Sequence, residues 1–258
     1  MSLRILFSRL WRILFFINGA LMFLLLFPFF KLLLSKEKWF PHAFRLKRIL
    51  ARLIVFNTGI SVTKIGDVNL DPCKAYVICP NHTSFLDIVV SYLVIPNYFH
   101  YIGKAELLKV PFFNIFFQKM NIVVDRGSIM ASHRAFQRCC DDIEKSISIA
   151  IFPEATIPTD TPELGNFKNG PFKLAIEKQI PIVPITYLDN WRLLPDSKTP
   201  RGRGGPGSSR VVIHEPIPTA GLTEDDMNSL KKKVYLTIRK SLEEHHIIQA
   251  KKSHELKT

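Results

Sequence analysis

The chain has 258 residues, enough for one α/β domain with an appendage and a sizeable hydrophobic core. Apolar residues make up 47% and charged residues 22%, so intrinsic disorder is excluded for the chain as a whole. Its four cysteines form no C-x-x-C pair and show no zinc-ligand spacing, which excludes a disulfide scaffold and favours a reducing compartment. The formal net charge of +13 is concentrated in residues 1–57, where ten basic residues and one acidic residue give a charge of +9.

Residues 1–57 are predicted to be a membrane-associated helical segment. Residues 13–30 contain no charge, and at about 1.5 Å per residue they extend roughly 27 Å as a helix, close to the ~30 Å of a hydrocarbon core. This length allows a spanning or a half-inserted helix, and basic residues on both sides leave its orientation open. A secretory signal peptide is disfavoured because no small-residue cleavage site follows Phe30 and Lys31 comes next.

Residues 40–60 are predicted to form an amphipathic helix. Apolar residues recur there at steps of three and four, with Arg45, Lys47, Arg48 and Arg52 between them. Two placements fit this pattern. The helix can lie on an anionic lipid surface, or it can pack on the following domain with its arginines in solvent.

An α/β domain is predicted over residues 58–246, followed by a basic tail over 247–258. Short apolar runs alternate with longer helical stretches, which indicates βαβ crossovers and a mixed, largely parallel sheet flanked by helices. The predicted strands are 75–79, 99–103, 122–125, 147–152, 182–187 and 210–214. The predicted helices are 85–94, 105–119, 129–145, 171–178 and 224–245.

His82 and Asp87 follow the first of these strands, where the chain enters a helix. Loops at the carboxyl ends of strands are where open α/β sheets bind their ligands. On one regular helix the two side chains would point to different faces, so they meet only if the chain turns between them. A carboxylate bound to one imidazole nitrogen fixes the tautomer and leaves the other nitrogen free to accept a proton. The alternative is a turn histidine beside an acid that the helix dipole favours.

Two more polar side chains follow predicted strands. Glu154 comes after strand 147–152, where its carboxylate can hold a donor and nearby backbone N–H groups can hold an anion. Arg126 comes after strand 122–125 and is suited to grip a phosphate. Spacing alone also allows an ordinary turn at Glu154 and a surface ion pair at Arg126.

Four segments, taken in order, resemble the sequence blocks of the glycerolipid acyltransferase family, specifically the 1-acylglycerol-3-phosphate acyltransferases. The resemblance covers about residues 75–190. It is specific because four blocks occur in the same order with similar spacing. The matching blocks are Asn81-His82-x4-Asp87, Val123-Val124-Asp125-Arg126, Phe152-Pro153-Glu154-Ala155-Thr156 and Val183-Pro184-Ile185.

The resemblance implies transfer of a fatty acyl chain from acyl-CoA or acyl carrier protein to the free hydroxyl of lysophosphatidate, which gives phosphatidic acid. It implies that His82 acts as general base on the hydroxyl and that Asp87 orients it. It also implies that no acyl-enzyme, metal or cofactor is needed. By the same resemblance, Arg126, Glu154 and Thr156 line the pocket for the acceptor phosphate.

The resemblance further implies a role for Lys104, which matches a recurrent lysine near the active centre, and for the apolar stretch 110–117, which would help house an acyl chain. The expected partners are membrane lipids, lysophosphatidate and the acyl donor. Nucleic acid is not expected, because it would explain the positive charge but not the apolar N-terminus. The expected location is a membrane, with the active domain on its cytoplasmic face.

The third block departs at two positions from the family pattern Phe-Pro-Glu-Gly-Thr-Arg. Ala155 replaces a glycine, which adopts a positive φ without cost, and Ile157 replaces an arginine, which binds phosphate through two N–H groups. Lys168 or Lys173 is the candidate to supply the missing cation. The alternatives are an acyltransferase for another lyso-lipid, such as a lyso-ornithine lipid or another lysophospholipid, and a non-catalytic membrane-surface binding protein.

Overall fold

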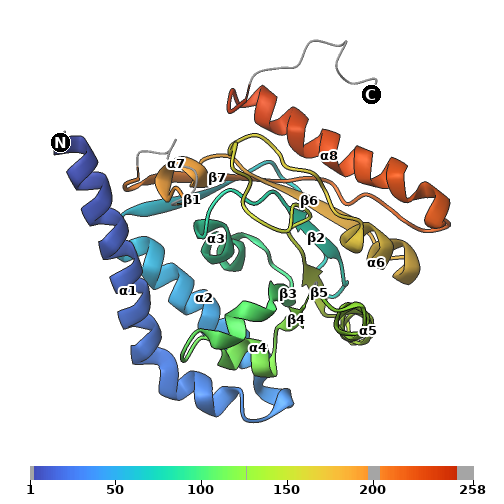
Figure 1. Ribbon diagram of the computed structural model, residues 1–258, viewed down its shortest axis with the longest axis horizontal. Helices are drawn as coiled ribbons and strands as arrows, with labels where there is room; N and C mark the ends of the chain where they lie inside the picture. The colour runs from blue at the N-terminus through green and yellow to red at the C-terminus, as the bar shows by residue number, and fades with distance from the viewer. Residues whose placement is uncertain (1–2, 126, 197–203, 249–258) are drawn as a thin grey trace.

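The computed structural model describes residues 3–125, 127–196 and 204–248. Its sheet has seven strands in the order β1-β7-β6-β2-β5-β3-β4, with helices on both faces (Figure 1). Within these described strands every neighbouring pair is parallel except β6 with β7. The mixed, largely parallel fold predicted from the sequence is confirmed. The strands are β1 (Ile60–Ile65), β2 (Val77–Pro80), β3 (Phe99–Lys104), β4 (Ile122–Val124), β5 (Ser148–Ala150), β6 (Ile182–Tyr187) and β7 (Gly207–Ile213).

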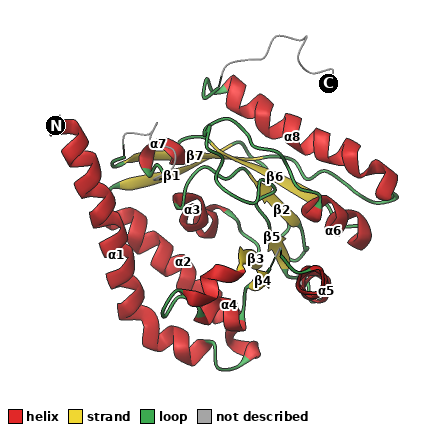
Figure 2. Cartoon of the chain, viewed as in Figure 1, coloured by secondary structure: helices red, strands yellow, loops and turns green. Residues whose placement is uncertain are grey.

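Helices cover the sheet in two layers (Figure 2). Ile78 of β2 packs with the layer that contains α2 and α3, whereas Val77 and Cys79 pack with the layer of α5, α6 and α8. Successive side chains of a strand point to opposite faces, so each strand contributes to both cores. The helices are α1 (Leu3–Leu33), α2 (Phe40–Asn57), α3 (Leu86–Val94), α4 (Ile115–Lys119), α5 (Ile129–Glu144), α6 (Gly170–Lys178), α7 (Asn190–Leu193) and α8 (Met227–Glu244), with short 3-10 turns η1 (Glu37–Trp39), η2 (Ala105–Lys109) and η3 (Glu224–Asp226).

The N-terminal helix α1 is longer than the uncharged stretch 13–30 and remains continuous over Leu3–Leu33. Trp11, Phe15 and Phe30 are buried against the rest of the protein, but most of its other large apolar side chains are exposed. Within the described part of the chain, Ile5–Leu33 is the one helical stretch long and apolar enough to cross a membrane.

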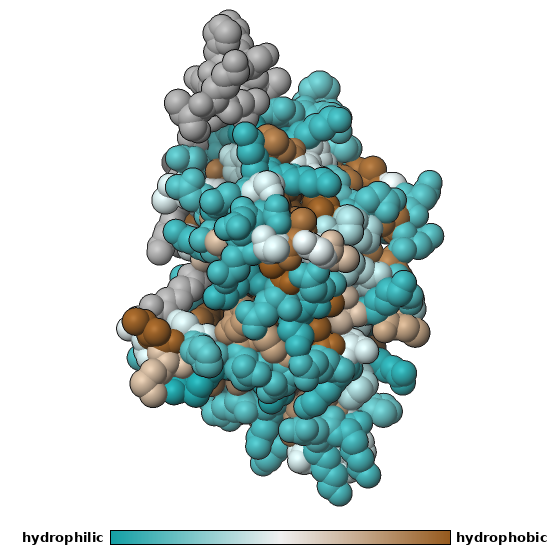
Figure 3. Space-filling view, turned by 90° about the vertical axis from the view of Figure 1, so that its right-hand side faces the viewer, coloured by the Kyte–Doolittle hydropathy of each residue, from teal (hydrophilic) through white to brown (hydrophobic). Residues whose placement is uncertain are grey.

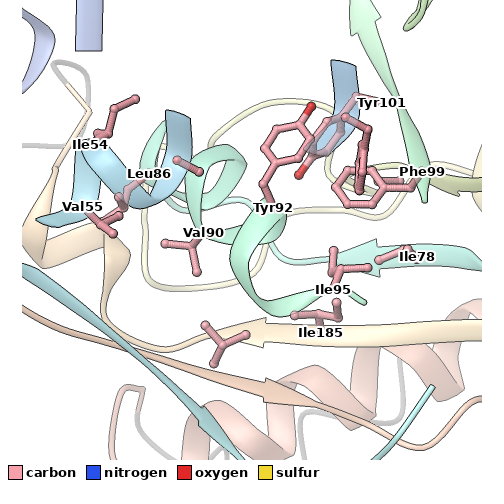
Figure 4. Close-up of a cluster of buried hydrophobic side chains, with 14 of the residues drawn as sticks. Ile54, Val55, Ile78, Leu86, Val90, Tyr92, Ile95, Phe99, Tyr101 and Ile185 are labelled. Carbon is pink, nitrogen blue, oxygen red and sulfur yellow. The ribbon is translucent and has the colours of Figure 1, made fainter. Parts of the chain in front are cut away.

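Helix α2 packs into the domain. Ile54 and Val55 lie beside Leu86 and Val90 of α3, in a cluster that also includes side chains of β2, β3 and β6 (Figure 4). Of the two placements that the sequence allows for this helix, the contacts match a helix packed on the following domain.

The cations of α2 do not all point to solvent. Lys47 is buried, with its ammonium 4.2 Å from the ring centroid of Phe116 and 3.5 Å from the sulfur of Met120, and desolvation lowers its pKa to about 7. Arg48 donates a hydrogen bond to the carbonyl of Pro96 at 2.8 Å. Arg48 therefore helps to hold the helix on the domain, whereas burial of the Lys47 ammonium has a desolvation cost.

Three elements differ from the sequence prediction. The predicted helix 105–119 is broken into η2 and α4, because Pro111 has no N–H group and disfavours helical geometry in the residue before it. Strand β1 was not predicted; it is an edge strand with only Ile60 buried, so it lacks a clear apolar alternation. Helix α7 was also not predicted, since four residues are too few for a periodic pattern.

Candidate active site

The candidate residues gather where the parallel strands have their carboxyl ends, which is the carboxyl edge of the sheet. Strands β2, β3, β4 and β5 are parallel neighbours, so their carboxyl ends lie on the same side. His82 follows β2, Lys104 ends β3 and Glu154 follows β5. Arg126, predicted to follow β4, lies outside the described residues.

His82 and Asp87 form a direct pair. The chain turns after β2 and enters α3 at Leu86, so His82 stays in the loop while Asp87 occupies the first helical turn. His82 Nδ1 lies 3.0 Å from Asp87 Oδ2. Asp87 is fully buried and the His82 side chain is 13% exposed. The carboxylate holds the proton on Nδ1, which leaves Nε2 as the nitrogen that can accept one.

Four further groups hold the Asp87 carboxylate. The N–H groups of Thr83 and Ser84 donate to Oδ2 at 2.6 and 2.8 Å. The hydroxyl of Thr83 and the side-chain amide of Asn190 donate to Oδ1 at 3.1 and 2.9 Å. A buried carboxylate needs such donors to replace the water it has lost. Asn190 is fixed in turn by Ser209, whose hydroxyl donates to the Asn190 amide oxygen at 2.6 Å.

Glu154 binds backbone rather than side chains. Its Oε1 accepts the N–H of His82 at 2.8 Å, and its Oε2 accepts the N–H of Gly165 at 2.6 Å. Desolvation raises the pKa of Glu154 to about 7, although both N–H bonds oppose this shift; the charge of Asp87 adds to it. The carboxylate thus fastens the His82 loop to the loop that follows β5. Its predicted contact with an acceptor phosphate stays a prediction.

Aromatic rings fix the plane of the His82 imidazole. Phe152 stacks on it with centroids 3.9 Å apart and an interplanar angle of 18°. The ring of Tyr101 in turn stacks with that of Phe152, with centroids 5.8 Å apart and an interplanar angle of 9°. Sequence reasoning missed both this stack and Asn190. Phe152 belongs to the third block, but nothing in that block indicates that its ring stacks on His82.

The altered third block keeps a backbone shape that suits glycine. Ala155 has a φ of +67°, so the left-handed conformation is present although the residue carries a Cβ. Thr156 is exposed and Ile157 is half-buried. The backbone N–H of Lys168 donates to the carbonyl of Pro153 at 2.8 Å, which places residue 168 beside this block.

The remaining predicted cations separate into two groups. Lys104 and Lys168 are exposed residues in segments at or beside the carboxyl edge. Lys173 instead lies on α6, with its ammonium 3.3 Å from a carboxylate oxygen of Glu224. Of the two lysines considered as substitutes for the missing arginine, Lys168 is therefore the one that the fold brings next to the third block.

Two other features limit what the site can hold. Within the described residues, no group of three or more His, Cys, Asp and Glu side chains is arranged to bind a metal ion. A hollow of about 620 Å³ lies beside α7, lined by Trp191, Arg192, Leu193 and residues 204–208, and it does not include His82.

The fold and site together define an α/β protein with a histidine–aspartate centre at the carboxyl edge of a mostly parallel sheet. The family model described as Acyltransferase matches residues 61–188. Residues 61–188 therefore form an acyltransferase-family domain, and the resemblance based on the four blocks is confirmed.

Related proteins agree with this assignment. A 1-acyl-sn-glycerol-3-phosphate acyltransferase of Chlamydomonas reinhardtii is 31% identical over 159 residues, which are 61% of this chain and 47% of the relative. The alpha enzyme of that name from Mus musculus is 30% identical over 67% of this chain and 60% of the relative. The chain thus spans about half the length of these curated relatives. The crystal structure of the 1-acyl-sn-glycerophosphate (LPA) acyltransferase PlsC from Thermotoga maritima has the same fold, with a TM-score of 0.77 at 20% identity, covering 96% of this chain and all of that one.

Proposed function

We propose that the chain is a 1-acylglycerol-3-phosphate O-acyltransferase, which moves a fatty acyl chain from a thioester donor to lysophosphatidate and so forms phosphatidic acid. The observation that carries the proposal is the His82–Asp87 pair, with Nδ1 bound at 3.0 Å and the ring stacked on Phe152. The names of the relatives supply the substrate class.

In the proposed reaction, His82 Nε2 removes the proton from the acceptor hydroxyl as its oxygen attacks the thioester carbonyl carbon. The new C–O bond forms, the C–S bond breaks, and the imidazolium returns the proton to the leaving thiolate. Asp87 stabilises the imidazolium and keeps Nε2 directed at the hydroxyl. Glu154 holds the backbone of His82 during both steps. No covalent acyl-enzyme is required.

We place the acceptor phosphate among the cations of the carboxyl edge. Lys104 and Lys168 are exposed there, and Thr156 is exposed in the third block. Arg126 follows directly after Asp125 and completes the proposed set. These positive charges complement a phosphomonoester, which forms strong charge-assisted hydrogen bonds.

The direct test is an assay of the purified full-length protein in detergent–lipid micelles. Acyl-CoA and acyl carrier protein thioesters are each supplied with a panel of lyso-lipids, and the products are identified by mass. We expect phosphatidic acid from lysophosphatidate with wild type and none with His82→Ala. Vesicle binding without any acylated product would indicate the non-catalytic alternative. The comparison of the two thioesters identifies the donor.

A second candidate acceptor follows from one observation. Ile157 places a half-buried apolar side chain where the resemblance leads one to expect an arginine. If the acceptor is a zwitterionic or aminoacyl lyso-lipid, Ile157→Arg shifts kcat/KM towards lysophosphatidate. If the acceptor is lysophosphatidate, Lys168→Ala raises KM for it and Ile157→Arg has little effect, because the phosphate is already neutralised.

We further propose that α1 lies within one leaflet of a membrane instead of crossing it. Trp11 Nε1 donates to the carbonyl of Thr58 at 3.2 Å, and the ring of Phe30 lies 4.9 Å from that of Phe116. The two anchors are 19 residues apart, about 28 Å of helix and close to the thickness of a hydrocarbon core. A crossing helix would carry them to opposite sides of the bilayer, yet both contact the same domain.

The test uses substitutions on α1, because removal of residues 1–57 would also remove the buried α2. Replacing exposed Ile13, Leu14 and Leu21 by serine should release the protein from anionic vesicles in a co-sedimentation assay.

We place the active domain on the cytoplasmic face, where thiols stay reduced; all four cysteines are free. Labelling of exposed Cys73 in sealed membranes with an impermeant thiol reagent checks this side.

A further inference from the structure

Exposed large apolar side chains are distributed unevenly over the described surface. Apart from those of α1 and α2, all of them belong to segments that follow β2, β3 and β4 at the carboxyl edge of the sheet. By contrast, the face of the molecule on the side of α6 and α8 is mostly hydrophilic (Figure 3). The residues concerned are Phe85, Leu108, Val110, Phe112, Ile129 and Met130.

The first part of this apolar edge is continuous with α1. The ring of Phe85, which is 51% exposed, contacts Phe16 of α1 edge to face with centroids 6.5 Å apart. Phe112, in the connection between β3 and α4, contacts Phe27 of α1 at 5.2 Å. The chain then leads through β4, the last strand of the sheet, to the start of α5.

The first turn of α5 forms the far end of the edge. Ile129 is 90% exposed and Met130 is 71% exposed. The hydroxyl of Ser128 caps the helix by accepting the N–H of Ala131 at 3.2 Å, so the two apolar side chains project from an ordered helix start. They border a shallow hollow of about 330 Å³ together with His133 and Arg134.

We infer that the tip of α5, formed by Ile129, Met130, His133 and Arg134, is a second membrane contact that inserts at an anionic lipid surface. The two apolar side chains enter the boundary between headgroups and acyl chains, while Arg134 meets lipid phosphates. This inference rests on the proposed membrane association of α1. Contacts through both α1 and the tip of α5 would hold the carboxyl edge, which carries His82, against the bilayer. Both the lipid substrate and the lipid product reside there.

The test reads the position of the tip directly. A Cys73→Ser background removes the exposed native thiol and leaves Cys79, Cys139 and Cys140, which are buried. Ile129→Cys is labelled with an environment-sensitive fluorophore, and Lys232→Cys on the exposed side of α8 serves as the matched control. Vesicles of phosphatidylcholine and phosphatidylglycerol carry a quencher attached to the acyl chain.

With vesicles present, we expect the label at position 129 to shift to the blue and to lose about half or more of its fluorescence to the quencher, and the label at 232 to change little. A label at 129 that stays in water on vesicle-bound protein would overturn the inference. A blue shift at 129 without vesicles would also overturn it, since it would indicate a protein partner or a second copy on the tip.

An activity measurement separates this inference from the proposed function. Ile129→Ser with Met130→Ser should lower the rate on vesicle-borne acceptor about tenfold and leave the rate on a monomeric short-chain acceptor unchanged. Equal rates for this variant and wild type on vesicles would contradict the second contact while the acyltransferase assignment stood. If wild type transferred no acyl chain, the proposed function would fail, and the fluorescence measurement would still decide the membrane contact.

Discussion

Among the described residues, two histidine–aspartate pairs differ in what the second ring nitrogen of the histidine contacts. In the first, His82 Nδ1 lies 3.0 Å from Asp87, and the side chain of His82 is 13% exposed. In the second, His100 Nδ1 lies 2.7 Å from Asp142, and the His100 side chain is 1% exposed. The hydroxyl of Tyr98 is 2.8 Å from Nε2 of His100, so both nitrogens of that ring are engaged.

The comparison shows how the pair that we propose as a general base differs from a structural pair. Burial is the main cause that lowers the pKa of His100, against the hydrogen bond and charge of Asp142, while the charges of Lys47 and Arg138 lower it further. His100 joins β3 to α5 and has no nitrogen left for a substrate. His82 lies beyond the end of a strand, where one nitrogen remains available. The chemistry of the pair is shared, and its position at the edge of the sheet makes the difference.

The largest expected effect is on the first pair. His82→Ala should lower kcat by about 10²–10⁴-fold, because general-base assistance is lost. Asp87→Asn should also lose most activity, since the amide no longer stabilises the imidazolium. Rates are measured with saturating donor and acceptor, and circular dichroism checks the fold. Near-wild-type turnover by a folded His82→Ala protein would falsify the mechanism.

The second pair should respond in stability instead. His100→Leu removes a hydrogen bond to the buried Asp142 carboxylate, which keeps its ion pair with Arg138 at 3.2 Å, and should lower the free energy of unfolding by about 1.5–3 kcal/mol. Denaturant unfolding in detergent measures this change. The activity per folded molecule should stay near that of wild type; a specific loss of kcat would show that the two pairs are not functionally distinct.

Asn190 offers a finer test, because it acts on His82 only through Asp87. Asn190→Ala removes one donor from Asp87 Oδ1 and should lower kcat about tenfold with little change in KM. In an Asp87→Asn background the same substitution should cost almost nothing further. Ser209→Ala, which only loosens the Asn190 amide, is the matched control and should have a smaller effect. Losses that multiply in the double variant would indicate a general structural role.

The smallest effect concerns pH. The Glu154 carboxylate accepts two N–H bonds, and protonation weakens them, so activity should rise as pH increases through its pKa of about 7. Stability should change in the opposite direction. The raised pKa means that the folded state binds more protons between pH 4.5 and 7, so unfolding free energy should fall over that range by roughly 3 kcal/mol or less.

Glu154→Gln provides the control for both trends. The amide does not titrate, so the rise in activity near pH 7 and the loss of stability between pH 4.5 and pH 7 should both become smaller. Rate profiles and denaturant unfolding at these pH values measure them. Unchanged profiles in the variant would assign the pH dependence to another group.

Local sequence pattern and block order were enough to predict several features of the protein. The apolar run of α1, the buried strand β6 and the turn between His82 and Asp87 all follow from residues close together in the chain. The alternation of strands and helices was enough to predict a largely parallel sheet, and that sheet places the ends of β2 to β5 at one edge.

The contacts that support the site depend on tertiary packing. Asn190 reaches Asp87 across 103 residues, and Glu154 reaches the His82 backbone across 72. Phe152 was visible in its block, but its stacking on His82 depends on how β5 lies beside β2. Lys47 is one of the cations of the predicted amphipathic helix, and the packing of α2 on the domain buries it. Such contacts depend on how distant segments pack, and neither periodicity nor spacing records which side chains will meet across a sheet.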